Sequence, residues 1–258
     1  MPPPASAPKS SCKATDFNKI GKSTLFLGIK TQPRIALHAG LCYYPGAMDN
    51  EAYQVATPLF RAITTGDTAA VRRLLAEGED PNECYGADEE PALLVAAVER
   101  REEIVQLLLE AGAYPDYGDM CGYTPLMAAV CADAINIVKL LIAAGADPHR
   151  HSGCSGANAL QDAAIGGHAD IVELLLSHGV KPDDSENAEG MTALMCAVQA
   201  LDATSVQLLL THGANPTTRS SKGDTALDLI NTKLTELWEP IKRTKAQKIL
   251  ALLQSATA

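Results

Sequence analysis

The sequence predicts an all-α solenoid, in which helix-turn-helix units are joined by hairpin-like fingers and closed by C-terminal capping helices. Two observations predict this fold class. The 258 residues are 47% hydrophobic but only 4% aromatic, so Ala and Leu, which are good helix formers, supply much of the apolar content. A Leu-Leu run followed by Gly also recurs five times at a spacing of 33 or 34 residues, and a period of this length is typical of repeat proteins.

The glycines define the repeat. In every unit the Gly is followed three residues later by Pro and is preceded, 19 residues earlier, by Leu. Because these Leu–Gly and Gly–Pro spacings are the same in all five units, each unit is predicted to be one structural module. The glycines are Gly78, Gly112, Gly145, Gly179 and Gly213, with steps of 34, 33, 34 and 34 residues.

The opening of each unit predicts a first helix. Thr57-Pro58 and Thr124-Pro125 combine a capping hydroxyl with a Pro in the first turn, where the missing N–H costs nothing. Small residues follow, as in Ala128-Ala129 and Ala163-Ala164. We expect these small side chains to let neighbouring helices approach closely.

The second half of each unit predicts a second helix. Ile104, Val105, Leu108 and Leu109 form one apolar helical face. The helix ends at Gly, which readily adopts the left-handed conformation found just past helix ends. The Pro then prevents continuation, and a polar finger leads to the next unit.

These features resemble the ankyrin repeat family, whose signature includes the 33-residue period and the Thr-Pro-Leu opening seen at Thr124-Pro125. The resemblance covers about residues 55–224 and implies a stack of helix pairs that binds proteins. One departure is consistent. The His that usually follows this opening, and that ties neighbouring turns by hydrogen bonds, is replaced, so we expect a stack that relies more on apolar packing. The replacements are Phe60, Leu94, Met127, Gln161 and Met195.

Three segments are expected. Residues 1–48 are a basic head rich in Pro and Ser, with six Lys or Arg residues and one acid, Asp16. This composition fits a disordered tail or an organelle transit peptide, and a third explanation is an extension upstream of a start at Met48. The sequence leaves all three open. Residues 49–224 contain the five repeats and carry a net charge of −17.

Residues 225–258 are expected to form a sixth, atypical repeat that caps the stack. Its opening matches the other units, but its second helix is expected late, near Ile249–Leu253, after an insertion that contains Trp238. A terminal repeat must cover the last apolar face of a solenoid. We therefore expect Trp238 to pack against the cap.

Composition argues against several classes of protein. The net charge of −10 is unsuited to nucleic-acid binding, which needs clustered cations. No apolar stretch approaches the length that a membrane span requires. The seven cysteines are odd in number, widely spaced and without a CxxC motif, which predicts reduced thiols rather than a disulfide framework or a zinc site.

The motifs that could indicate nucleotide or metal binding are incomplete. Gly21-Lys22-Ser23-Thr24 resembles the end of a phosphate-binding loop, but Asp16 stands where that motif needs Gly. His149, His151 and Cys154 lie close together on one finger, but they offer three metal ligands and no evident fourth. We expect them to be solvated. No catalytic residue, metal ligand or cofactor is predicted, and we expect the chain not to be an enzyme.

The function expected is that of a non-enzymatic interaction scaffold or adaptor, which binds a protein partner through its finger tips and concave face. The alternative is a ligand- or metal-responsive regulatory protein that uses the head or the Cys and His residues. We expect a cytoplasmic monomer that binds neither nucleic acid nor membrane, with nuclear and organellar locations left open.

Tyrosines and acids mark the candidate partner site. The finger around Tyr117, Met120 and Tyr123 is expected to form its centre, because Tyr is enriched at binding hot spots. Glu90 and Glu99 are expected beside it, and these acids predict a partner with a basic surface. The full candidate set is Tyr85, Asp88, Glu89, Glu90, Glu99, Tyr117, Met120 and Tyr123.

Overall fold

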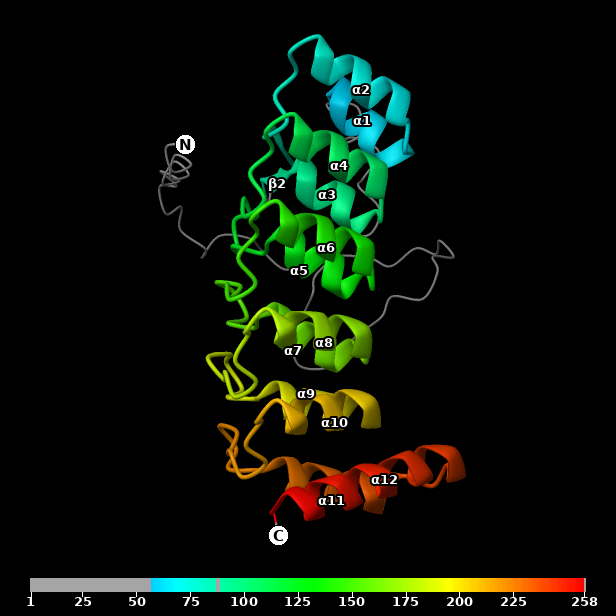
Figure 1. Ribbon diagram of the computed structural model, residues 1–258, viewed down its shortest axis with the longest axis vertical. Helices are drawn as coiled ribbons and strands as arrows, with labels where there is room; N and C mark the ends of the chain where they lie inside the picture. Colours follow the sequence, from blue (N-terminus) through cyan, green and yellow to red (C-terminus); the bar gives the residue numbers. More distant parts are fainter. Residues whose placement is uncertain (1–56, 87–88, 258) are drawn as a thin grey trace, which may run out of the picture.

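The computed structural model describes residues 57–86 and 89–257. The basic head, its phosphate-loop-like segment and Asp88 lie outside the described residues. The described residues form twelve helices in six consecutive pairs, which stack along one axis (Figure 1). The prediction of an all-α solenoid is confirmed.

Each pair contributes a first and a second helix to the stack. First helices contact the first helices of the neighbouring pairs, and second helices contact second helices. The first helices are α1 (Pro58–Thr65), α3 (Ala92–Val98), α5 (Pro125–Cys131), α7 (Ala159–Gly166), α9 (Ala193–Ala200) and α11 (Ala226–Glu236). The second helices are α2 (Thr68–Ala76), α4 (Glu102–Glu110), α6 (Ile135–Ala143), α8 (Ala169–Ser177), α10 (Ala203–Thr211) and α12 (Pro240–Thr257).

Capping side chains begin most of the first helices, as the sequence predicts. The hydroxyl oxygens of Thr57, Thr124, Thr192 and Thr225 each accept a hydrogen bond from the backbone N–H three residues later. In α7 the cap is Asn158, whose side chain accepts from that N–H in the same way. These bonds satisfy backbone donors that a helix start leaves without partners.

The turn between the two helices of a pair adopts a left-handed conformation at one position. This position follows the first helix, and its φ is 73° at Gly66 and 71° at Gly167. Non-glycine residues hold the same conformation in three other pairs, with φ of 56° at Arg100, 53° at Asp133 and 57° at Leu201. A side chain is costly there, because Cβ crowds the following carbonyl oxygen.

The core is apolar and continuous along the stack. The five residues that replace the usual His are 1–3% exposed, as the packing prediction requires. Gln161 is the polar one among them. Its side-chain nitrogen donates to the carbonyl oxygens of Asp184 (2.7 Å) and Met191 (3.0 Å) in the next finger. Four pairs therefore place an apolar side chain at this position, and one retains hydrogen bonds.

The fingers join each second helix to the next pair, and they lie together on one side of the stack (Figure 1). Their described residues are 77–86 with 89–91, 111–124, 144–158, 178–192 and 212–225. The first finger contains the two-residue strands β1 (Cys84–Tyr85) and β2 (Glu90–Pro91), which pair antiparallel.

A polar side chain links neighbouring fingers at a repeated position. The side-chain oxygens of Asn82, Asp116 and Asp183 accept from the backbone N–H groups of Tyr114, Asp147 and Asn215 at 2.8–2.9 Å. His149 occupies the same position in the finger 144–158. There the link is made instead by His151, whose Nε2 lies 2.8 Å from Oδ2 of Asp184. The expectation that His151 is solvated is therefore wrong, since its side chain is only 25% exposed.

The expectation of reduced thiols is wrong at one pair. Cys121 and Cys154 form a disulfide between the fingers 111–124 and 144–158, with Cα atoms 5.2 Å apart. Their separation of 33 residues is one repeat, so they occupy the same place on adjacent fingers. Neither the number of cysteines nor the absence of a CxxC motif indicates this pairing, because it exists only where the repeat aligns two fingers.

The C-terminal cap differs from its prediction in two respects. The second helix of the sixth pair begins at Pro240, well before Ile249. Trp238 is 86% exposed rather than packed against the cap, and Ile241 is 76% exposed. Within α12 the buried residues are Ala246, Ile249 and Leu253, so its first turns extend beyond the stack (Figure 1).

The left-handed position predicts an unusual preference for Gly. We expect the Leu201→Gly protein to unfold with a free energy about 1 kcal/mol higher than the Leu201→Ala protein, because only Gly escapes the Cβ penalty. The control is Ala200, the last residue of α9, where Gly should instead be less stable than Ala. Denaturant unfolding of the variants measures both differences. Equal stability of the two Leu201 variants would contradict the argument.

Candidate partner-binding surface

Large exposed apolar side chains gather on one finger. Five such side chains occur in the described part of the chain, and three lie in the finger 111–124. Tyr114 is 45% exposed, Tyr117 is 37% exposed and Met120 is 57% exposed. The other two are Trp238 and Ile241 at the far end of the stack. A cluster of this kind on a rigid scaffold is typical of a protein-binding surface.

A tight turn holds the tip of this finger. Oδ1 of Asp119 accepts hydrogen bonds from the backbone N–H groups of Cys121 and Tyr123, both at 2.9 Å. The chain passes so closely at Gly118 that an added Cβ would lie 2.7 Å from the carbonyl oxygen of Tyr123. The tip is thus shaped by its own bonds, and Met120 is exposed on it.

Tyr117 contacts the preceding finger. Its hydroxyl group lies close enough to the Cys84 thiol for that group, together with nearby negative charge, to raise the pKa of Tyr117 to about 12. The Cys84 thiol itself donates to the carbonyl oxygen of Asn82 at 3.7 Å. Burial raises the pKa of the Cys84 thiol, and the hydrogen bond from Tyr117 partly opposes this effect. Tyr117 therefore stays protonated at neutral pH.

Acidic side chains surround this contact. The negative charges of Glu89 and Asp80 raise the pKa of both Tyr117 and Cys84, and the charge of Glu83 raises the pKa of Cys84. Glu89 is exposed, and Glu90 is half-buried in β2. Glu89 and Glu90 were predicted from the sequence, but Asp80 and Cys84 were not, because only the pairing of the two fingers brings them close to Tyr117. Glu83, which was also not predicted, lies near Cys84.

The structure removes two candidates from this surface. Tyr85 is only 7% exposed, and its ring lies 4.3 Å from that of Phe60, so it belongs to the core. Glu99 caps the C-terminal end of α3, opposite the fingers, and its carboxylate lies 4.0 Å from Arg101. It is therefore not beside Tyr117, as the sequence led us to expect.

Tyr123 is a weaker candidate than its neighbours in the finger 111–124. It is half-buried and packs against the hydrophobic core. Its replacement would therefore disturb packing as well as the surface. Tyr117 and Met120, with Glu89 beside them, are the exposed part of the predicted site.

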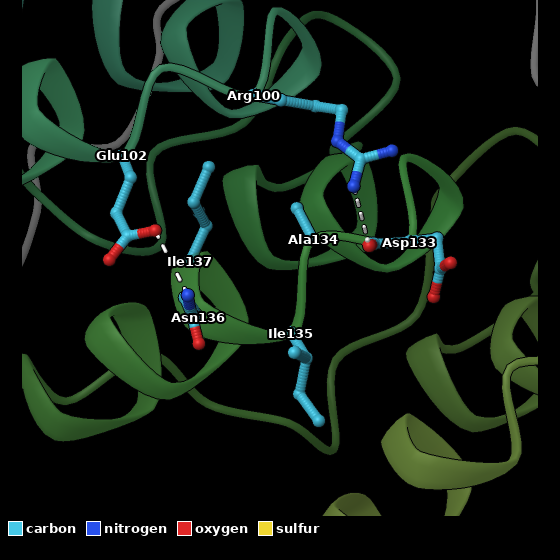
Figure 2. A pocket seen from close by; sticks show the side chains of 7 residues that line it. All are labelled: Arg100, Glu102, Asp133, Ala134, Ile135, Asn136 and Ile137. Atoms are coloured by element: carbon cyan, nitrogen blue, oxygen red, sulfur yellow. Dashed lines mark hydrogen bonds between the residues drawn. The ribbon is translucent and has the colours of Figure 1, made fainter.

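A shallow depression lies at the opposite side of the stack, between the turns of the second and third pairs. Its volume is about 180 Å³, which is below the range of pockets that bury a small-molecule ligand. Its polar side chains are already bonded (Figure 2): Arg100 donates to the carbonyl oxygen of Asp133 at 3.1 Å, and Asn136 donates to Glu102 at 3.1 Å. The depression thus offers few groups for a ligand.

Comparison with known proteins identifies the fold. A family model described as ankyrin repeats matches residues 59–152 and 145–220. The chain belongs to the ankyrin repeat family. Ankyrin repeats generally mediate protein–protein interactions, and this agrees with a surface built from finger tips rather than a pocket.

The curated relatives match this chain over only a small share of their own length. Glycerophosphocholine phosphodiesterase gde1 of Schizosaccharomyces pombe is 34% identical over 150 residues, which are 56% of this chain and 13% of that protein. The 2-5A-dependent ribonuclease of Mus musculus is 45% identical over 64 residues, 24% of this chain and 9% of that protein. The nuclear factor NF-kappa-B p105 subunit of Gallus gallus is 34% identical over 116 residues, 44% of this chain and 12% of that protein. The ankyrin repeats are therefore similar, and the remainder of each relative is not matched.

The described residues contain neither a membrane-spanning helix nor a metal-binding cluster. None of the helices there combines the length and apolar character that crossing a membrane requires. No group of three or more His, Cys, Asp or Glu side chains in residues 57–86 and 89–257 could hold a metal ion.

The contact between Tyr117 and Cys84 makes a chemical prediction. The Tyr117→Phe protein should alkylate several-fold more slowly at Cys84 at pH 8, because the thiolate loses the donor that lowers its pKa. Iodoacetamide labelling, followed by mass spectrometry of the peptide that contains Cys84, gives the rate. Tyr114→Phe, on the same finger, is the control and should react like the parent protein. An unchanged or faster rate in Tyr117→Phe would show that the hydroxyl does not stabilise the thiolate.

Proposed function

We propose that the chain is a non-enzymatic interaction scaffold or adaptor, which binds a protein partner through the fingers 77–91 and 111–124. One observation carries the proposal: Tyr117 and Met120 are exposed together on a finger tip held by its own hydrogen bonds. A rigid tip loses little entropy on binding, and Tyr is enriched in hot spots.

The partner proposed has a basic surface. Asp80 and Glu89 lie near Tyr117, and residues 49–224 carry 27 acidic against 10 basic side chains. Complementary charge accelerates association and is screened by salt. We propose that the protein is monomeric and acts in the cytoplasm, and that residues 49–224 with the capping repeat 225–258 form one folding unit.

The alternative is a ligand- or metal-responsive regulatory protein. It is less well supported, because the depression of about 180 Å³ is small and its polar groups are paired. Of the three finger residues that could have bound a metal, Cys154 is in a disulfide and His151 is paired with Asp184. The described part of the repeats thus offers no ligand site that supports this alternative.

The proposed surface predicts which substitutions affect binding. Tyr117→Ala and Met120→Ala should each weaken binding to a captured partner by about 1–2 kcal/mol, because each removes exposed apolar contact area. Both side chains are exposed, so the melting temperature should change little. Isothermal titration calorimetry and thermal unfolding measure the two quantities.

Trp238→Ala is the matched control, because it removes an exposed aromatic side chain at the other end of the stack. It should bind like the parent protein. The proposal fails if Tyr117→Ala and Met120→Ala bind normally, or if Trp238→Ala alone loses binding. Association rates that are equal at low and high ionic strength would contradict the basic partner.

A further inference from the structure

Two cysteines meet because they share a register. Cys121 and Cys154 each stand nine residues after the Gly that ends a second helix, Gly112 and Gly145. Neighbouring fingers place equivalent positions side by side, and the two residues are joined by a disulfide. In the next two fingers Ala188 and Lys222 occupy this position. The register thus brings two thiols together at only one place among these four fingers.

The fold has other means of holding the fingers together. The backbone N–H of Gly153 donates to the carbonyl oxygen of Cys121 at 2.7 Å. Similar bonds join the following fingers, where Ala188 donates to Ser155 at 3.2 Å and Ser221 donates to Glu189 at 2.9 Å. Those finger pairs stand without a disulfide. The bond between Cys121 and Cys154 can therefore open without unfolding the stack.

The disulfide is also accessible. Cys154 is exposed, and Cys121 is half-buried. By contrast, Cys196 is only 9% exposed, and burial raises its pKa to about 12. Exposed disulfides are the ones that small thiols can reach and reduce.

We propose that Cys121 and Cys154 form a reversible thiol–disulfide exchange site, whose reactants are small disulfides and thiols such as oxidised and reduced glutathione. In oxidation, the Cys154 thiolate attacks one sulfur of the small disulfide and releases one small thiol. The Cys121 thiolate then attacks the Cys154 sulfur and releases the second. The two cysteines lose two protons and two electrons, and the small disulfide gains them as two thiols. Reduction is the reverse.

The redox state of the two cysteines determines how freely the fingers 111–124 and 144–158 move relative to each other. The bond adds a covalent link next to Met120, at the tip of the finger 111–124. Reduction leaves the hydrogen bond from Gly153 to Cys121 and the bonds of Asp119 in place. The tips then remain paired but open more often. This inference does not depend on the proposed partner site, although it would bring that site under redox control.

The test uses the full chain in buffers that contain defined ratios of reduced and oxidised glutathione. Differential alkylation and mass spectrometry should show a peptide linked through Cys121 and Cys154 under oxidising conditions. The same peptides should carry two free thiols in excess reduced glutathione, while the helical circular dichroism is unchanged. Hydrogen–deuterium exchange of the Gly153 amide should rise roughly tenfold on reduction. The finger 212–225, which the disulfide does not join, is the internal control.

Three variants and three outcomes complete the test. Cys154→Ser should leave Cys121 without the intramolecular link. In Cys121→Ser/Cys154→Ser, hydrogen–deuterium exchange of the Gly153 amide should match that of the reduced parent protein under both oxidising and reducing conditions. The proposal is overturned if excess reduced glutathione leaves the bond intact in the folded protein. It is also overturned if the two cysteines carry only separate glutathione adducts, or if reduction unfolds the stack. Cys84→Ser should behave like the parent protein, which separates this site from the contact with Tyr117.

Discussion

Close approach of the first helices is the constraint on which the structure depends. Each of the five register leucines is followed three residues later by Ala, and these alanines are 0–3% exposed. A larger side chain at a close-packed contact would push the helices apart. In the capping pair, which has no further neighbour, the equivalent residue is Ile230, also fully buried. The five alanines are Ala62, Ala96, Ala129, Ala163 and Ala197.

This spacing also creates the surface. When helix pairs stack at a constant distance, each finger lies beside the next one, and equivalent residues meet. Cys121 and Cys154 are such an equivalent pair. The Asp116 side chain reaches the backbone of Asp147, which stands two positions earlier in the next finger. Tyr117 and Cys84 meet across fingers in the same way. The candidate site and the disulfide are both consequences of the stacking.

The sequence predicted the fold because the repeat makes its period visible along the chain. Helix starts at Thr57 and Thr124, and the exposure of Tyr117 and Met120 on a finger, also followed from local signals. Contacts between fingers did not follow. Like Tyr117, Tyr85 lies among finger residues in the sequence, yet its ring packs on Phe60 in the first pair. The disulfide was missed for the same reason, since spacing alone does not say which residues of two fingers touch.

Trp238 shows a different limit. A capping repeat was expected to use its largest apolar side chain as cover, but α12 begins at Pro240 and covers the stack with Ala246, Ile249 and Leu253 instead.

The most direct measurement of the central claim concerns the buried alanines. Ala129→Leu should lower the free energy of unfolding by about 1–3 kcal/mol, whereas Ala143→Leu, at an exposed position of the adjacent α6, should change it little. Equal stability of the two variants in denaturant unfolding would contradict the account.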